Sequence, residues 1–218
     1  MIFTLTSVTL YAAAAFFLAL LMNLVRKNTT LVTLYLLQSV VTSLALISLA
    51  YSEGTIGLLW AGLLTLAVKA VMAPAFLMRM IQQYSAHFSA TSYLSLPLSM
   101  LALAVMTAFS YSFIAESIRG FSASPGIPLL FAAIFSILFL MVNRRGALAA
   151  VVGVLALENA IILVAAFLGL HHSFGLEFAI AFDIAVWIGI AVAFLTMMHR
   201  QFGAVDTATL TMTQLTEE

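Results

Sequence analysis

The sequence predicts an all-α membrane protein with about seven transmembrane helices, its N-terminus outside and its C-terminus inside. Of the 218 residues, 64% are hydrophobic and 7% are charged, and the mean hydropathy is +1.18. Soluble chains are about 45–50% apolar and about 25% charged. The apolar runs are roughly 17–27 residues long, which suits membrane-spanning helices and excludes the short alternating strands of an outer-membrane barrel.

Each expected helix is an apolar run bounded by charges or turn residues. The runs cover residues 5–25, 31–51, 56–82, 92–115, 127–143, 147–169 and 175–199. The first run is followed, not preceded, by basic residues, which is the wrong order for a cleaved signal peptide, so we expect it to remain as an anchor. Residues 1–120 would form a four-helix block, residues 121–200 a three-helix block, and residues 201–218 a polar cytoplasmic tail with no apolar face.

The basic residues set the expected orientation. Those in odd-numbered connections and in the tail are Arg26, Lys27, Arg79, Arg144, Arg145 and Arg200, whereas Arg119 alone lies in an even-numbered connection. Lys and Arg are retained on the cytoplasmic side of a bilayer. We therefore expect a multi-pass protein of the cell inner or plasma membrane, with tyrosines such as Tyr35 near the inner boundary at headgroup level.

Composition also excludes several functions. Eight basic and eight acidic residues cancel, so there is no basic field to hold nucleic acid. The absence of cysteine and the four scattered histidines give no ligand set for zinc or an iron–sulfur cluster. We expect no metal, no cofactor and no active site belonging to this chain alone.

Three charged side chains lie at membrane depths where the hydrocarbon core makes a charge energetically unfavourable. Lys69 lies near the middle of the third expected helix, Glu158 near the middle of the sixth, and Asp183 inside the seventh. A charge at the helix centre costs about 2.5–3.5 kcal/mol even on insertion scales, and such residues usually mark ion or proton paths. Since low dielectric disfavours the charged form of each group, all three could exchange protons near neutral pH. The alternative is a buried pair between Lys69 and Glu158 that only holds helices together.

Four neighbouring residues are candidates for supporting such a path. Pro74 follows the lysine by five residues and frees the backbone carbonyl of Ala70 beside it, although an ordinary kink is an equal interpretation. Thr65 lies one turn before the lysine, where its hydroxyl could solvate the ammonium group. Asn159 could hold a water beside the glutamate, while Gln38 is more simply explained as an interhelical hydrogen bond.

The C-terminal part of the chain resembles a known family. A basic pair, Arg144-Arg145, precedes a helix that carries Glu158 in the sequence GVLALEN, and the next helix carries Asp183 in the sequence FAIAFD. This arrangement resembles the NuoK/MrpC-like subunits of the complex I family, in which a basic pair opens a helix bearing an intramembrane glutamate. Such subunits normally have glutamate where this chain has Asp183.

The whole chain resembles the longer HyfE-type membrane subunit of group 4, formate-hydrogenlyase-like hydrogenases, which has a lysine-and-proline helix like the segment LAVKAVMAP ending at Pro74. The resemblance implies a non-catalytic subunit embedded in lipid, between antiporter-like subunits and subunits that anchor a quinone or hydrogenase arm. It places Glu158 and Asp183 in a lateral chain of buried charges, with Lys69 as its basic member. We therefore expect a proton-translocation role in a respiratory oxidoreductase complex. An assembly or scaffold subunit without a proton role, and a cation/proton antiporter component, remain as alternatives.

Overall fold

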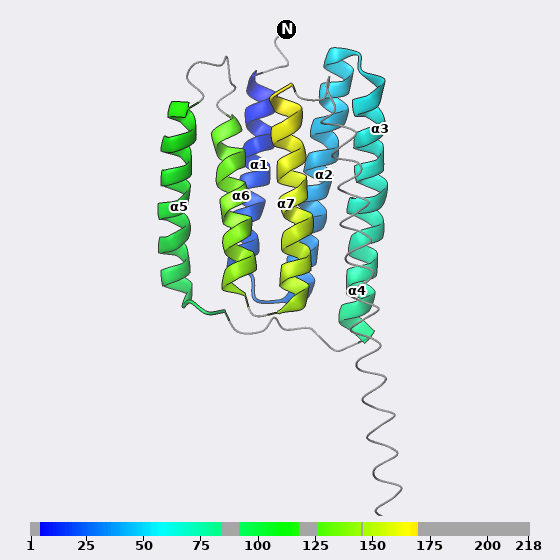
Figure 1. Cartoon of the computed structure of the whole chain (residues 1–218). Coiled ribbons are helices and arrows are strands. Elements are labelled where there is room, and N and C mark those ends of the chain that lie inside the picture. Colours follow the sequence, from blue (N-terminus) through cyan, green and yellow to red (C-terminus); the bar gives the residue numbers. More distant parts are fainter. Residues whose placement is uncertain (1–4, 84–91, 118–125, 145, 170–218) are drawn as a thin grey trace, which may run out of the picture. The chain divides into compact units, whose positions relative to one another are not determined.

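The computed structural model describes residues 5–83, 92–117, 126–144 and 146–169, all of which belong to one compact unit, residues 1–179. In this part of the chain the helices run alternately up and down beside one another (Figure 1). Six helical spans are long and apolar enough to cross a membrane. The all-α prediction is thus confirmed for the described residues, as is a multi-pass membrane protein by length and composition. The seventh expected helix, with Asp183, lies outside the described residues.

The elements follow the predicted order closely. They are α1 (Leu5–Leu24), α2 (Asn28–Glu53), α3 (Ile56–Leu64), the π-helix η1 (Thr65–Met72), α4 (Ala73–Gln83), α5 (Leu96–Ser117), α6 (Gly126–Asn143) and α7 (Ala147–Phe167). Of these, α3, η1 and α4 continue into one another and form the single span Ile56–Gln82. The predicted boundaries differ most at α2, which begins at Asn28 and not at residue 31, and at α5, which begins at Leu96 and not at residue 92.

A tight turn joins α2 to the third span. Gly54 has the left-handed backbone conformation, with φ of 67°, and its N–H donates to the carbonyl of Ala50. Glycine takes this conformation without the steric cost that a Cβ brings. The turn makes α2 and α3 an antiparallel pair, so that the middle of the third span comes back beside the middle of α2.

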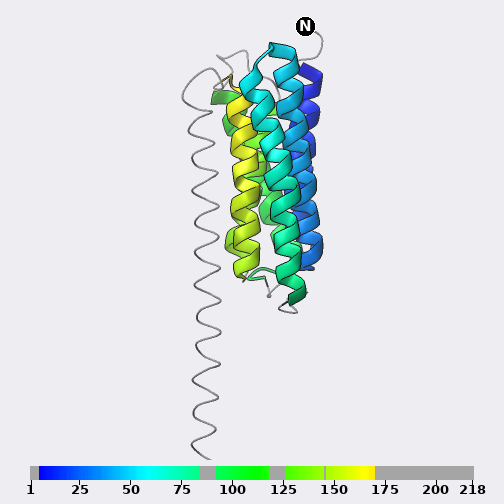
Figure 2. The same ribbon diagram turned by 90° about the vertical axis from the view of Figure 1, so that its right-hand side faces the viewer.

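Four helices, α1, α2, α6 and α7, surround a common apolar core. Its buried members are Ala12, Ala15, Ala45, Leu130, Leu163 and Val164. The alanines allow helix backbones to approach closely, which is how transmembrane helices gain packing energy where hydrocarbon offers no hydrophobic drive. The third span packs on α2 at one side of these four helices, and α5 packs on α6 at the other (Figures 1 and 2).

A second apolar cluster joins α3 to α7 as well as to α2. It consists of Leu46, Ala50, Leu58, Ala61 and Ala166. These residues lie toward the end of α7 and the start of α3, so together with α2 they link the two helices two to three turns away from the middle of each span. This contact positions the candidate site described below.

Arg144 ties together helix ends at the opposite end of the bundle. Its guanidinium Nη2 donates to the carbonyl oxygens of Met22 (3.0 Å) and Asn23 (3.3 Å), in the last turn of α1. Those carbonyls lack intrahelical donors and carry the negative end of the helix dipole, so a buried cation there is stabilising. Arg144 is 8% exposed, and burial lowers the pKa of its guanidinium below the ordinary value, although an arginine stays protonated in proteins. The sequence had predicted a side chain that reaches water.

Asn143, next to Arg144, explains the late start of α5. Its backbone carbonyl accepts from the N–H of Tyr93 at 2.9 Å, and its side-chain Oδ1 accepts from the N–H of Leu94 at 3.0 Å. Its amide Nδ2 donates to the hydroxyl of Ser99 at 3.1 Å. The residues ahead of α5 are therefore held by α6 and are not available for a first helical turn.

Replacing Arg144 by methionine is expected to lower the free energy of unfolding by about 1.5–3 kcal/mol, because it leaves buried carbonyls without a charged donor. Methionine keeps the length and the apolar stem of the side chain. The free energy can be measured by denaturant titration of the purified protein. Arg26→Met, at an exposed position near the same helix end, is the control and should change it little. Equal losses in the two variants would contradict a capping role for Arg144.

Candidate functional site

An ion pair lies buried at the middle of the bundle. Lys69 in η1 and Glu158 in α7 place Nζ 3.2 Å from Oε2, with side chains that are 0% and 2% exposed. Lys69 is the central residue of the span Ile56–Gln82, and Glu158 lies at the centre of the span Leu148–Phe167. The structure therefore brings together two of the three charges that the sequence singles out. The third, Asp183, is outside the described residues.

The lysine lies in a widened stretch of helix. Thr65–Met72 is a π-helix, and the N–H of Ala73 donates to the carbonyl of Val68, five residues earlier. The next possible donor would be Pro74, which has no N–H, so the wide register cannot continue past it. The sequence predicts that Pro74 disturbs the helix beside the lysine. The structure shows this disturbance as π-helical turns ahead of a buried proline. Short π-helical insertions are rare and frequently occur at functional sites.

Polar side chains from α2 meet α7 beside the ion pair. Asn159 Nδ2 donates to the hydroxyl of Ser39 at 2.9 Å, and Gln38 Nε2 donates to the carbonyl of Ala156 at 3.5 Å. Gln38, Ser39 and Asn159 are all 0% exposed. Gln38 therefore makes the interhelical hydrogen bond that the simpler interpretation expected, and Asn159 makes one as well.

The amide oxygens of these two residues are buried without a donor. Neither Gln38 Oε1 nor Asn159 Oδ1 has a hydrogen-bond partner among the described residues. A buried amide oxygen left unsatisfied costs about 1–3 kcal/mol, so such atoms usually accept from an ordered water. Thr65, in the same π-helix as the lysine, is also buried at 5% exposure. Polar side chains of α2, η1 and α7 are therefore buried in the same helices, and at positions near the pair along η1 and α7.

Several buried polar residues of α2 escaped the sequence analysis. Thr42 and Ser43 are fully buried, and the hydroxyl of Ser43 donates to the carbonyl of Gly62 in α3 at 2.8 Å. Tyr35 is 0% exposed, so its ring packs inside the bundle, while its level near the headgroups stays a prediction. The signal that could have found them is their spacing: Tyr35, Gln38 and Thr42 recur at helical intervals on one face.

Gly62 lets α3 lie directly against α2. A Cβ at this position would come 2.7 Å from Cγ1 of Ile47, 3.2 Å from its backbone N and 3.3 Å from the carbonyl oxygen of Ser43. Two of these atoms belong to the backbone of α2, which cannot move aside as a side chain can. The absence of a side chain at Gly62 therefore sets the distance between the two helices, two turns before Lys69.

Replacing Gly62 by valine is expected to lower the free energy of unfolding by about 1–3 kcal/mol, because it overpacks this contact. It should also move η1 away from α7 and so weaken the ion pair. Unfolding by denaturant measures the first effect. Gly57→Val, at an exposed position of the same helix, is the matched control. If Gly57→Val were as harmful as Gly62→Val, helix propensity and not the close contact would be responsible.

The chemistry open to this arrangement is proton exchange between a carboxylate and an ammonium group inside a membrane span. Lys69 and Glu158 are in contact, and the amides of Gln38 and Asn159 border them from α2 and α7. Comparison of the chain with protein-family models, with curated proteins and with solved structures finds no match.

Proposed function

We propose that this protein is an integral membrane subunit of a complex I-like respiratory assembly, linked to a hydrogenase, and that Lys69 and Glu158 lie on its proton path. Asp183 is the further acidic member that the sequence suggests. The observation that carries the proposal is the 3.2 Å ion pair, buried at the centre of two apolar spans. The kind of assembly rests on the resemblance of residues 144–183 to NuoK-like subunits and of the whole chain to HyfE-type subunits.

Energetics favour a functional pair over a purely structural one. Desolvating two charges costs several kcal/mol per ion, and replacing a buried pair by apolar residues is often neutral or stabilising. Within a membrane, ionisable side chains that face the bundle interior commonly belong to ion or proton pathways. A pair that adds little to stability is easier to understand if the proton affinity of one member changes when the other gains or loses a proton.

Polar groups beside the pair could extend it into a path. The oxygens of Gln38 and Asn159 are buried without a donor among the described residues, and buried waters bind otherwise unsatisfied polar atoms of this kind. The π-helix around Lys69 supports the same view, because π-helical turns are rare and frequently occur at functional sites. Protons would then move between Glu158 and its neighbours through hydrogen-bonded water.

A second candidate is an assembly or scaffold subunit without a proton role. It is favoured by the direct interhelical bonds from Asn159 to Ser39 and from Ser43 to Gly62. In this case the ion pair would serve only to fix how α2, η1 and α7 dock on one another. The two candidates predict different outcomes for the same substitutions, which the Discussion sets out.

The partners can be identified by affinity purification of the tagged full chain from its own membrane in a mild detergent. We expect antiporter-like membrane subunits together with a hydrogenase module that contains a nickel-bearing subunit. A set of proteins with no redox module would overturn the proposed assembly. Cation transport by the isolated chain in proteoliposomes would instead favour an antiporter component.

A further inference from the structure

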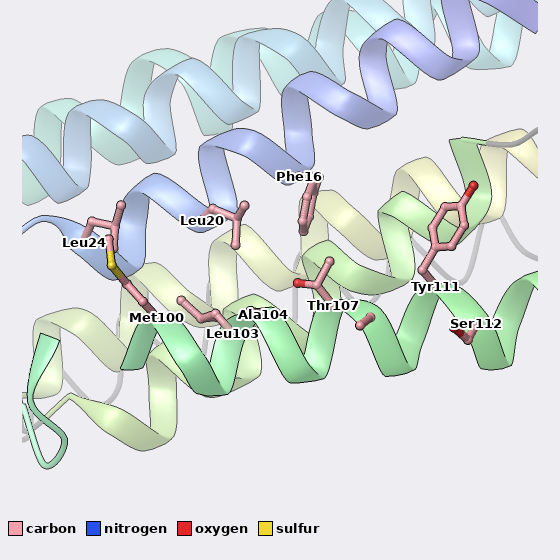
Figure 3. Close-up of a pocket in the computed structure, with 10 residues that line it drawn as sticks. Phe16, Leu20, Leu24, Met100, Leu103, Ala104, Thr107, Tyr111 and Ser112 are labelled. Carbon is pink, nitrogen blue, oxygen red and sulfur yellow. The ribbon is translucent and has the colours of Figure 1, made fainter. Parts of the chain in front are cut away.

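A groove lies between α1 and α5, away from the ion pair. It has a volume of about 760 Å³ and is lined almost entirely by apolar side chains (Figure 3). Leu24 and Met100 lie at one end, Phe16 and Thr107 lie farther along, and Tyr111 lies at the other end (Figure 3). None of the residues that line it belongs to the candidate site.

The groove exists because α5 packs on α6 and hardly touches α1. Small residues of α5, among them Ala104 and Ala108, line the gap and leave it open. Ala104 remains exposed although it lies at the centre of the lining, and Leu101 and Val105 beside it are 61% and 60% exposed. This side of the bundle is therefore an apolar surface with a hollow in it.

The length of the groove, which passes the middle of the span Leu96–Ile114, is close to that of one acyl chain. From Met100 to Ser112, α5 advances about 18 Å at 1.5 Å per residue. Half of the hydrocarbon core is about 15 Å, whereas a transmembrane helix needs about 30 Å of surface. A single acyl chain entering from one side of the membrane matches this length, and a partner helix crossing the whole membrane does not.

Positive charge stands at one end of the groove. Leu24, which lines that end, is followed by Arg26 and Lys27, both exposed. The nearby Arg144 donates to carbonyls of α1 and is 8% exposed, so it is occupied within the protein. Basic residues at the boundary of the hydrocarbon region attract the phosphates of anionic lipids. The two exposed cations thus complement the phosphate of an anionic lipid, and the apolar groove complements its acyl chain.

We propose that the groove between α1 and α5 is a binding site for an anionic phospholipid, with an acyl chain along the groove and the phosphate at Arg26 and Lys27. The site is independent of the proton path and would hold a lipid whichever function the ion pair serves. It differs from ordinary lipid contact because it selects the headgroup: the two basic residues lie at the end of the groove that holds the acyl chain.

Photo-crosslinking in the native membrane tests this site. A benzoylphenylalanine at position 104 places the reactive group in the groove, and one at position 105 places it on the neighbouring exposed face of the same helix. Adducts are released and identified by mass spectrometry. We expect phosphatidylglycerol or cardiolipin to be enriched at position 104 over the bulk membrane, and bulk composition at position 105.

Charge substitutions separate a selective site from general lipid contact. The double variant Arg26→Gln with Lys27→Gln should lower the enrichment at position 104 by about tenfold, since each basic residue near the surface contributes to anionic lipid binding. Arg79→Gln, at another exposed basic position, should leave it unchanged. A protein adduct at position 104, bulk lipid composition there, or enrichment that survives the double variant would each overturn the proposal. If the position 104 variant does not accumulate, position 20 on α1 presents the same groove from the other wall.

Discussion

Replacing Glu158 by glutamine is expected to lower proton translocation by about tenfold or more while the complex stays assembled, because an amide of the same shape cannot take up and release a proton. Glutamine retains an oxygen that can accept from the Lys69 ammonium, which lies 3.2 Å from Oε2 in the native protein. The docking of η1 on α7 should therefore survive. Proton uptake into inverted membrane vesicles, driven by electron flow from the redox partner, measures the effect.

Glu116→Gln provides the control for this variant. Glu116 lies at the exposed end of α5, so the same chemical change there should leave proton translocation intact. Native gel electrophoresis of both variants establishes whether the complex is assembled. Unchanged pumping in an assembled Glu158→Gln complex would rule out a relay role for Glu158. Loss of the complex itself would favour the scaffold alternative.

Replacing Lys69 by methionine is expected to lower the free energy of unfolding by about 3–5 kcal/mol, because it removes one partner of a buried ion pair and leaves a carboxylate without its cation. Methionine preserves most of the apolar stem, so lost packing contributes little. Unfolding of the purified protein by denaturant measures the loss. Arg79→Met, at an exposed position of the same span, should have a small effect, and equal effects would contradict the importance of the pair.

The double variant Lys69→Met with Glu158→Leu distinguishes structure from function. Removing both charges should restore most of the lost stability, since apolar packing of similar volume can replace a buried pair. If the pair lies on a proton path, the stable double variant should assemble but fail to pump. If it is only structural, the double variant should recover both assembly and pumping. A double variant that pumps normally would therefore eliminate the proton path through these residues.

The sequence identified the charged members of the site and offered the pairing of Lys69 with Glu158 as one alternative, but it could not show that the two side chains meet. Lys69 and Glu158 stand out because each lies at the centre of an apolar run, where a charged side chain is energetically costly and usually functional. Their contact depends on which helices are neighbours, and α3 and α7 are brought together by long-range packing of small residues such as Ala61 and Ala166. Hydropathy gives the length and number of spans and contains little information on which of them touch.

The exposure of Arg144 was misjudged because sequence position was taken as membrane depth. Arg144 follows an apolar run, which predicts a side chain reaching toward water, yet it turns inward to the end of α1. Tyr35 lies close to the start of α2, and its ring also faces the bundle interior. Whether a side chain near a helix end points outward depends on the neighbours of that helix, which appear only in the folded structure.

The wide turns of η1 also determine the direction in which the side chains of α4 point. Buried side chains run down this span in one stripe through Leu58, Thr65, Lys69, Leu77 and Ile81. In an unbroken α-helix, at about 100° per residue, Ile81 would point roughly 140° away from Leu58. One additional residue in the wide turns offsets about 100° of this 140° rotation. The buried faces of α3 and α4 therefore point toward the same neighbouring helices. Deleting one residue between positions 65 and 72 should therefore convert the wide turns into regular α-helix and leave Leu77 and Ile81 on the same inner face as Leu58.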